Sequence, residues 1–590
     1  MVTDNPPSYS KSIAQDDKFF VDMRACQQHA SLLHTFFQLR SNDPETEKAY
    51  LVRAELRYLL WIQLVTKEKP DAHILPPIDV VYMWHAHLLS PFRYYEDMIR
   101  NKMELLLLPE RAFPLELLDL AKSQYQNGVN PESEAFWHRA YPKEPYLLNP
   151  GNLNSGQALI TCPYCLTTLA SEWSQYVKMR TDKQQSIKCD GCSKDVNVQV
   201  LSSARFMKDL AESTEDSVKV AGCHLDRAGG YHEVGKNVSA RLVELASRLD
   251  AKNWRTSGRR FNWQEIFWNM KSKKVLDPTT MPVFRILAKV AQSHYAGIPF
   301  STSLDLIFAV SRQWDFTAKM VDIDWNSPEA LADAVTRYRK FLMLMKDHPK
   351  QIMVPILSID LAWHTHMLNH AAYREYTLLH LEKVINHDDT ITSTLINYNL
   401  ITTAKLWYAK YREPYTTEDL GKLYKKANKA GFLFPPTTLY YMLQKKNLSK
   451  AWQEQPLVQN GEKRKPQKQD IVNHDSTHAN MLFGSSLLPA YFILGASGAY
   501  LGAAACQIGA TGAFGGIGAG SLGSNMGGYG SSMASNPGGC ASGRCGAGGC
   551  AVGSGGACAG GGGGCGGGGG GCGGGGGGCG GGGGGCGGGC

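Results

Sequence analysis

Four cysteines in the first third of the chain have a spacing that is typical of a metal site. They form two CxxC pairs, Cys162 with Cys165 and Cys189 with Cys192, with 23 residues between the pairs. Each pair can present two thiolates from one turn, and Zn²⁺ accepts four sulfur ligands in tetrahedral geometry. Four thiolates leave no coordination position open, so we predict a structural Zn²⁺ site. Reduced thiols without a metal are the alternative.

A Trp-His-x-His motif that occurs twice is the second candidate for chemistry. The motif residues are Trp84, His85, His87, Trp363, His364 and His366. On a helix, Asp360 would reach His364 one turn later, and His366 would reach His370 in the same way. Either pair could bind a metal or orient a general base.

The first copy of the motif argues against chemistry that both copies share. The positions that match the acid and the last histidine of the second copy hold Val81 and Pro91. We therefore expect the motif to be structural in both copies, with the tryptophan in the core and each imidazole hydrogen-bonded, because an unpartnered buried polar group costs about 1–3 kcal/mol. A site of Asp360, His364 and His366 in the second copy alone is the catalytic alternative.

The sequence around the two motifs also matches, which indicates an internal repeat. Asp43-Pro44 and Ser327-Pro328 each place a capping residue before a proline, and this pattern predicts the start of a helix. The further matched pairs, in the same order along the chain, are Arg57-Tyr58 and Arg337-Tyr338, Pro76 and Pro355, Tyr94 and Tyr373, Glu96 and Glu375, Trp137 and Trp407, and Glu144-Pro145-Tyr146 and Glu413-Pro414-Tyr415. We predict a mainly α fold with two repeated helical modules.

Composition completes the predicted domain organisation. Residues 160–161 and 196–200 alternate like short strands around the cysteine pairs. Glycine dominates the C-terminal end, where little apolar area can be buried to offset backbone entropy. The predicted segments are a disordered N-terminus (1–19), helical module 1 (20–150), a small zinc-ribbon-like β insert (155–202), a connecting helical region (203–320), helical module 2 (321–447), a polar basic linker (448–483) and a disordered Gly/Cys-rich tail (484–590).

Charge and targeting signals are ordinary. The chain has 590 residues and a net charge of +8, which does not by itself indicate nucleic acid. The N-terminus lacks the apolar stretch of a secretory signal, so a cytoplasmic address is expected, with the nucleus as the alternative. Residues 487–506 are uncharged over the length of a bilayer, but they include a proline and several glycines. We expect this segment to stay out of the membrane.

The N-terminus carries a short sequence that suits a protein partner. Pro6, Pro7 and Tyr9 form a PPxY sequence. Its polyproline geometry and its tyrosine fit the groove of a WW domain. A WW-domain protein is therefore one expected partner.

The repeated blocks resemble the glycine-rich domain-containing protein family. The resemblance is carried by Leu75-Pro76-Pro77-Ile78-Asp79 before the first motif and by Ile359-Asp360-Leu361-Ala362 before the second, and it covers about residues 20–420 and the Gly/Cys-rich end. The resemblance implies a core domain of unknown biochemical function. The zinc-ribbon-like insert suggests a fungal-type member of the family. Plant members are associated with development and stress responses, and some are described as carrying an RNA-recognition-like segment.

These observations favour a non-enzymatic scaffold or interaction protein. An RNA-associated protein is the first alternative, although no aromatic run typical of an RNA-recognition motif occurs in this sequence. A metal-dependent enzyme that uses the second Trp-His-x-His motif is the other alternative. The sequence contains no nucleophile elbow, P-loop, dinucleotide fingerprint or HExxH motif.

Overall fold

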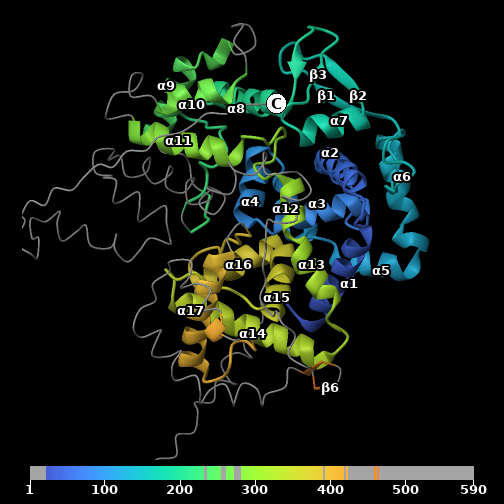
Figure 1. The fold of residues 1–590 in the computed structure, drawn as a ribbon, viewed down its shortest axis with the longest axis vertical. Coiled ribbons are helices and arrows are strands. Elements are labelled where there is room, and N and C mark those ends of the chain that lie inside the picture. Colours follow the sequence, from blue (N-terminus) through green and yellow to red (C-terminus); the bar gives the residue numbers. More distant parts are fainter. Residues whose placement is uncertain are drawn as a thin grey trace, which may run out of the picture. The chain divides into compact units, whose positions relative to one another are not determined.

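The computed structural model is mainly helical (Figure 1). It describes residues 21–226, 228–231, 236–253, 261–271, 281–389, 393–417 and 420–422, and two short strands, β5 (Val458–Gln459) and β6 (Glu462–Lys463). The PPxY sequence, the segment 487–506 and the Gly/Cys-rich tail lie outside the described residues. Every described residue belongs to the first of two units of the chain, Met1–Ala534.

The first helical region contains the first Trp-His-x-His motif. Its helices are α1 (Met23–Leu39), α2 (Pro44–Glu68), α3 (Ile78–Leu88), α4 (Pro91–Arg100), α5 (Leu115–Gln124) and α6 (Pro131–Ala140), with short 3₁₀ turns η2 (Glu104–Leu107), η3 (Pro109–Arg111) and η4 (Gln126–Gly128). The predicted start of α2 is confirmed, because the Asp43 carboxylate accepts a hydrogen bond from the backbone N–H of Thr46 at 2.9 Å. The motif itself lies on α3.

The cysteine pairs lie in a small β-containing segment. Strands β1 (Gln157–Thr161) and β2 (Thr168–Glu172) form an antiparallel hairpin, and helix α7 (Trp173–Thr181) separates it from β3 (Ile187–Lys188) and β4 (Asp195–Val196). The predicted strand at 196–200 is wrong beyond Val196. Asn197 accepts a hydrogen bond from the N–H of Val200 at 2.9 Å and thereby caps helix α8. A local side-chain cap has overridden the alternating pattern.

The connecting region forms a core of its own. Helices α8 (Val198–Glu212), α9 (Lys236–Arg248), α10 (Trp263–Lys271) and α11 (Met281–His294), together with the short turn η5 (Ala251–Asn253), surround a buried cluster that includes Phe206, Leu245 and Tyr295. Two shorter helices, α12 (Leu306–Arg312) and α13 (Trp314–Val321), lead to the second motif.

The second helical region contains the second motif on α15. Its helices are α14 (Pro328–Asp347), α15 (Leu357–Leu368), α16 (His370–Leu381) and α17 (Ser393–Tyr411). The predicted start of α14 is confirmed, since Ser327 Oγ accepts from the N–H of Ala330 at 3.3 Å. Tyr338 and Leu342 of α14 are fully buried.

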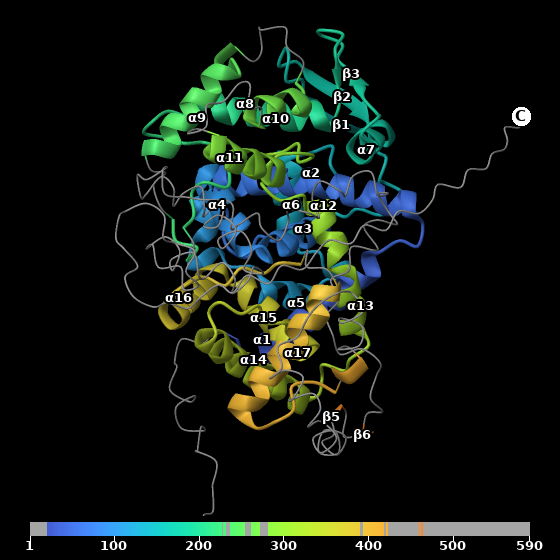
Figure 2. The same cartoon turned by 60° about the vertical axis from the view of Figure 1, so that its left-hand side comes forward.

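The two helical regions share one hydrophobic core, which includes both motif tryptophans. Helix α1 of the first region packs against α13, α14 and α15, and α3 contacts α12 and α15 (Figure 2). The two motif helices are therefore neighbours within a common interior. Among the described helices, none is both long and apolar enough to span a membrane.

Candidate metal centre and the histidine motifs

The two cysteine pairs lie in turns with the same backbone geometry. The N–H of Leu166 donates to the Cys162 carbonyl at 2.9 Å, and the N–H of Ser193 donates to the Cys189 carbonyl at 2.7 Å. Leu166 and Ser193 both adopt left-handed backbone angles, with φ of 65° and 58°. The two CxxC segments therefore form a matched pair of knuckles, each of which directs two sulfur atoms to one side.

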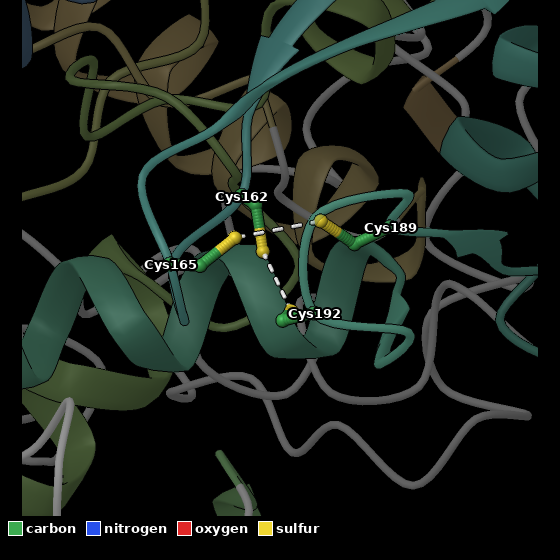
Figure 3. A group of neighbouring side chains, drawn as sticks. All are labelled: Cys162, Cys165, Cys189 and Cys192. Carbon is green, nitrogen blue, oxygen red and sulfur yellow. Dashed lines mark hydrogen bonds between the residues drawn. The ribbon is translucent and has the colours of Figure 1, made fainter.

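The four sulfur atoms converge on one point (Figure 3). Cys162 Sγ lies 3.8 Å from Cys192 Sγ, and Cys165 Sγ lies 3.5 Å from Cys189 Sγ. All four lie within 4.8 Å of one another. Tetrahedral Zn²⁺ with sulfur ligands at ~2.3 Å places its ligands about 3.8 Å apart, so the cluster fits a four-sulfur metal site.

The thiols in this cluster differ in acidity. A hydrogen bond with the Thr167 hydroxyl, 3.3 Å from Cys165 Sγ, lowers the pKa of Cys165 to about 6. Burial raises the pKa of Cys162 to about 12. Cys165 would thus offer a thiolate at neutral pH, whereas Cys162 would lose its proton only as a cation binds, which makes metal uptake release protons.

Each motif tryptophan makes the same hydrogen bond in the two helical regions. Trp84 Nε1 donates to Tyr94 Oη at 3.2 Å, and Trp363 Nε1 donates to Tyr373 Oη at 3.0 Å. All four side chains are buried. The tryptophan therefore ties each motif helix to the helix that follows it, α3 to α4 and α15 to α16.

The second histidine of each motif also has the same partner. His87 Nδ1 lies 2.9 Å from Tyr58 Oη, and His366 Nδ1 lies 2.9 Å from Tyr338 Oη. His87 has a further contact, since its Nε2 lies 3.2 Å from a carboxylate oxygen of Asp97. Burial would raise the pKa of Asp97, but the hydrogen bond from His87 and the charge of a neighbouring arginine outweigh it and lower that pKa.

A third matched contact joins an arginine to the Glu-Pro-Tyr block in each region. The Arg57 guanidinium donates to the Tyr146 carbonyl at 2.7 Å, and that of Arg337 donates to the Tyr415 carbonyl at 2.6 Å. The same two arginines lie over tryptophan rings of α6 and α17, at 4.8 Å and 5.0 Å from the ring centroids. Arg57 also pairs with a buried acid of its own region, Asp79, at 2.7 Å, whereas Arg337 pairs with the half-exposed Asp333 at 3.8 Å.

The first histidines of the two motifs have different partners. His85 Nε2 lies 2.9 Å from His29 Nε2 of α1, and His29 Nδ1 lies 2.9 Å from the Thr365 hydroxyl of the second motif. Burial lowers the pKa of His29 to about 3 and holds that of His85 well below its usual range. Both rings are therefore neutral at pH 7.

His364 instead faces an acid and another histidine. Its Nε2 lies 3.2 Å from Asp360 Oδ1 and 3.1 Å from His387 Nε2. Of the predicted catalytic alternative, Asp360 and His364 thus meet, but His366 lies on the Tyr338 side of the helix. His387, on the segment after α16, takes the third position.

The predicted contact between His366 and His370 is wrong, because the helix does not continue through both residues. It breaks at Asn369, whose side chain accepts from the N–H of Ala372 at 3.2 Å and begins α16. The His370 ring packs instead against Tyr94 and Tyr95 of α4, with centroids 5.0 Å and 5.6 Å away.

Comparison with known proteins shows which family the two motif-containing regions resemble. Residues 10–97 and 263–376 match the sequence model of the family described as glycine-rich domain-containing protein-like. The two matched regions include both Trp-His-x-His motifs and exclude the cysteine pairs. These two regions are similar to that family, and the resemblance noted in the motifs is confirmed.

Two curated relatives come from Arabidopsis thaliana. Glycine-rich domain-containing protein 2 is 32% identical over 166 residues, which are 27% of this chain and 20% of the relative. Glycine-rich domain-containing protein 1 is 39% identical over 93 residues, which are 15% of this chain and 11% of the relative. The chain thus spans a fifth or less of the length of these relatives. No solved structure matches the chain.

Proposed function

We propose that this protein is a non-enzymatic scaffold built on two repeated helical modules and a zinc-bound insert. The observation that carries the proposal is the burial of the repeated motif. His85, His87, His364 and His366 are only 1%, 0%, 0% and 1% exposed. Side chains that water barely reaches cannot meet a substrate from solution, whereas they can hold a rigid interior together.

The matched contacts support the proposal that residues 24–146 and 324–416 are copies of one module. Tryptophan–tyrosine, tyrosine–histidine and arginine–carbonyl contacts recur at corresponding positions. The tryptophan–tyrosine contacts join consecutive helices, and the other two kinds of contact join residues 28 to 89 positions apart. A copied fold explains all three at once.

We propose Zn²⁺ as the ion at the cysteine cluster, held by Cys162, Cys165, Cys189 and Cys192. With four protein ligands it would supply no open position for catalysis, and it would act as a cross-link between the β1–β2 and β3–β4 hairpins. This cross-link supports α7, which lies between the hairpins in sequence and packs on α2.

Helix α7 is the part of the insert that anchors it to the body. Arg180 donates to both carboxylate oxygens of Glu55 on α2, at 2.8 Å and 2.9 Å, and to Asp305 before α12 at 2.9 Å. All three side chains are buried. The insert is thereby joined to two separate parts of the helical body.

The zinc proposal is tested by measuring metal content in the full chain. Cys162→Ser should lose about one zinc per chain relative to the native protein and should make the segment 155–202 sensitive to protease, because a small zinc site stabilises mainly its own fold. Cys223→Ser is the matched control, since Cys223 is a buried cysteine that does not belong to the cluster. Unchanged zinc in Cys162→Ser would rule the site out.

The scaffold proposal is tested through the proposed WW-domain partner. The full chain should bind an isolated WW domain through Pro6, Pro7 and Tyr9, and Tyr9→Ala should abolish the binding measured by calorimetry. Tyr125→Ala is the control, because Tyr125 is an exposed tyrosine of the helical body. Binding that survives in Tyr9→Ala would show that the PPxY sequence is not the contact.

A further inference from the structure

Three side chains with metal-binding atoms converge inside the second helical region. Asp360 and His364 lie one turn apart on α15, and His387 comes from the segment between α16 and α17. His364 Nε2 is 3.2 Å from Asp360 Oδ1 and 3.1 Å from His387 Nε2, and the three ligand atoms all lie within 4.8 Å of one another. The three residues are 0%, 0% and 8% exposed.

A hydrogen bond at Nδ1 of His387 determines the tautomer of the ring, and therefore whether Nε2, which faces Asp360 and His364, can act as a ligand. His387 Nδ1 lies 3.1 Å from the backbone carbonyl of Leu89. A carbonyl oxygen can only accept, so Nδ1 carries a proton and donates it, and in the tautomer with this single ring proton Nε2 presents a lone pair. Histidines that bind metals are commonly held in this way by a backbone carbonyl behind the ring.

A cation explains the arrangement better than a hydrogen bond does. His364 Nε2 faces two acceptors, the carboxylate oxygen of Asp360 and the lone pair of His387. One N–H can point well at only one of them. One metal ion can attract all three atoms. Ligands at ~2.1 Å from an ion lie roughly 3.0–3.4 Å apart for angles between 90° and 109°, and this range includes the separations of 3.1 Å and 3.2 Å.

We propose that Asp360, His364 and His387 bind a divalent transition-metal ion of the class that prefers imidazole and carboxylate ligands, such as Zn²⁺, Fe²⁺ or Co²⁺. The site is separate from the cysteine cluster and goes beyond the proposed function. Because the ligand side chains are buried, the ion would have a structural role, as a cross-link inside the core. It would join α15 to the segment after α16 and, through His387 and Leu89, to the end of α3.

The first motif provides a natural comparison within the same chain. Its His85 matches His364, but the positions that match Asp360 and His387 are Val81 and Leu108. His85 meets the imidazole of His29 instead. The two motifs therefore share the tryptophan and tyrosine contacts and differ at the ligand set, so changes at His85 should not release the ion.

The test is metal analysis of the full chain, expressed with added Zn²⁺ so that the buried site can fill during folding. The total first-row transition metal per chain is measured in each variant and compared with that of the native protein. The cysteines of the C-terminal end could also bind zinc, but they are the same in every variant, so the difference reports the proposed site. Asp360→Asn and His387→Gln should each lose about one equivalent. His366→Gln and His85→Gln, two equally buried histidine changes, should lose none.

Folding and the cysteine site are monitored in the same samples. Circular dichroism reports the helices, and loss of the equivalent in Asp360→Asn with native helix content and an intact Cys162 cluster supports the site. Asp360→Asn that keeps the native metal content would overturn the proposal, as would equal losses in His366→Gln. Cys162→Ser should release a different equivalent, so failure of one site does not imply failure of the other.

Discussion

The tyrosine partners of the motif histidines offer a matched pair of perturbations. Tyr58→Phe and Tyr338→Phe each remove one buried hydroxyl that lies 2.9 Å from a histidine nitrogen. If residues 24–146 and 324–416 are copies of one module, the two substitutions remove the same contact from the same place. They should therefore destabilise the protein by similar amounts.

The expected magnitude follows from burial. Both hydroxyls are fully inside the core, so removing either leaves an imidazole nitrogen without that partner, at a cost of about 1–3 kcal/mol. For a cooperative unit of about 150–250 residues, each kcal/mol of lost stability lowers the melting temperature by about 2–4 °C. We expect falls of roughly 2–12 °C in both variants.

The assay is thermal unfolding of the full chain combined with hydrogen exchange read by mass spectrometry. Exchange should rise around α3 in Tyr58→Phe and around α15 in Tyr338→Phe. Tyr125→Phe, at a tyrosine that is 38% exposed, is the control and should change little. A large effect in one motif variant with none in the other would refute the equivalence of the two regions.

Two further predictions concern the anchor of the insert and the buried histidines. Arg180→Ala leaves the Glu55 and Asp305 carboxylates buried without their cation, so unfolding should become easier by about 3–5 kcal/mol, measured by urea titration; a loss below 1 kcal/mol would contradict this role. Burial holds the pKa of His29 at about 3, below its ordinary value of about 6.5. Its contribution to stability is therefore present above pH 6.5 and is lost as the pH falls toward 3. Between pH 7 and pH 5 the free energy of unfolding should fall by on the order of 2 kcal/mol. His29→Gln should make the melting temperature depend less on pH over this range. The same pH dependence in His29→Gln and in the native protein would refute this role of His29.

Local signals in the sequence predicted the elements that local forces determine. The capping residues Asp43 and Ser327, each followed by proline, located the starts of α2 and α14. The CxxC spacing identified the four cysteines that converge. In each case the information lies within a few residues, or in a chemistry that demands a fixed ligand number.

Contacts between distant segments could not be predicted in this way. His29 and His387 lie outside the repeated motif, and no spacing relates them to His85 or His364. Their partners are set by the packing of α1 against α15 and by the path of the chain after α16. The capping role of Asn369 could not be predicted either, because it depends on a turn of the chain between α15 and α16.

The cysteine cluster should bind a metal ion through four sulfur ligands and cross-link the two hairpins of the insert. Cadmium-113 NMR of the cadmium-loaded full chain tests it directly, because sulfur and nitrogen–oxygen ligands give well-separated signals. We expect a four-sulfur signal that disappears in Cys162→Ser and persists in Asp360→Asn. A spectrum in which no four-sulfur signal depends on Cys162 would contradict it.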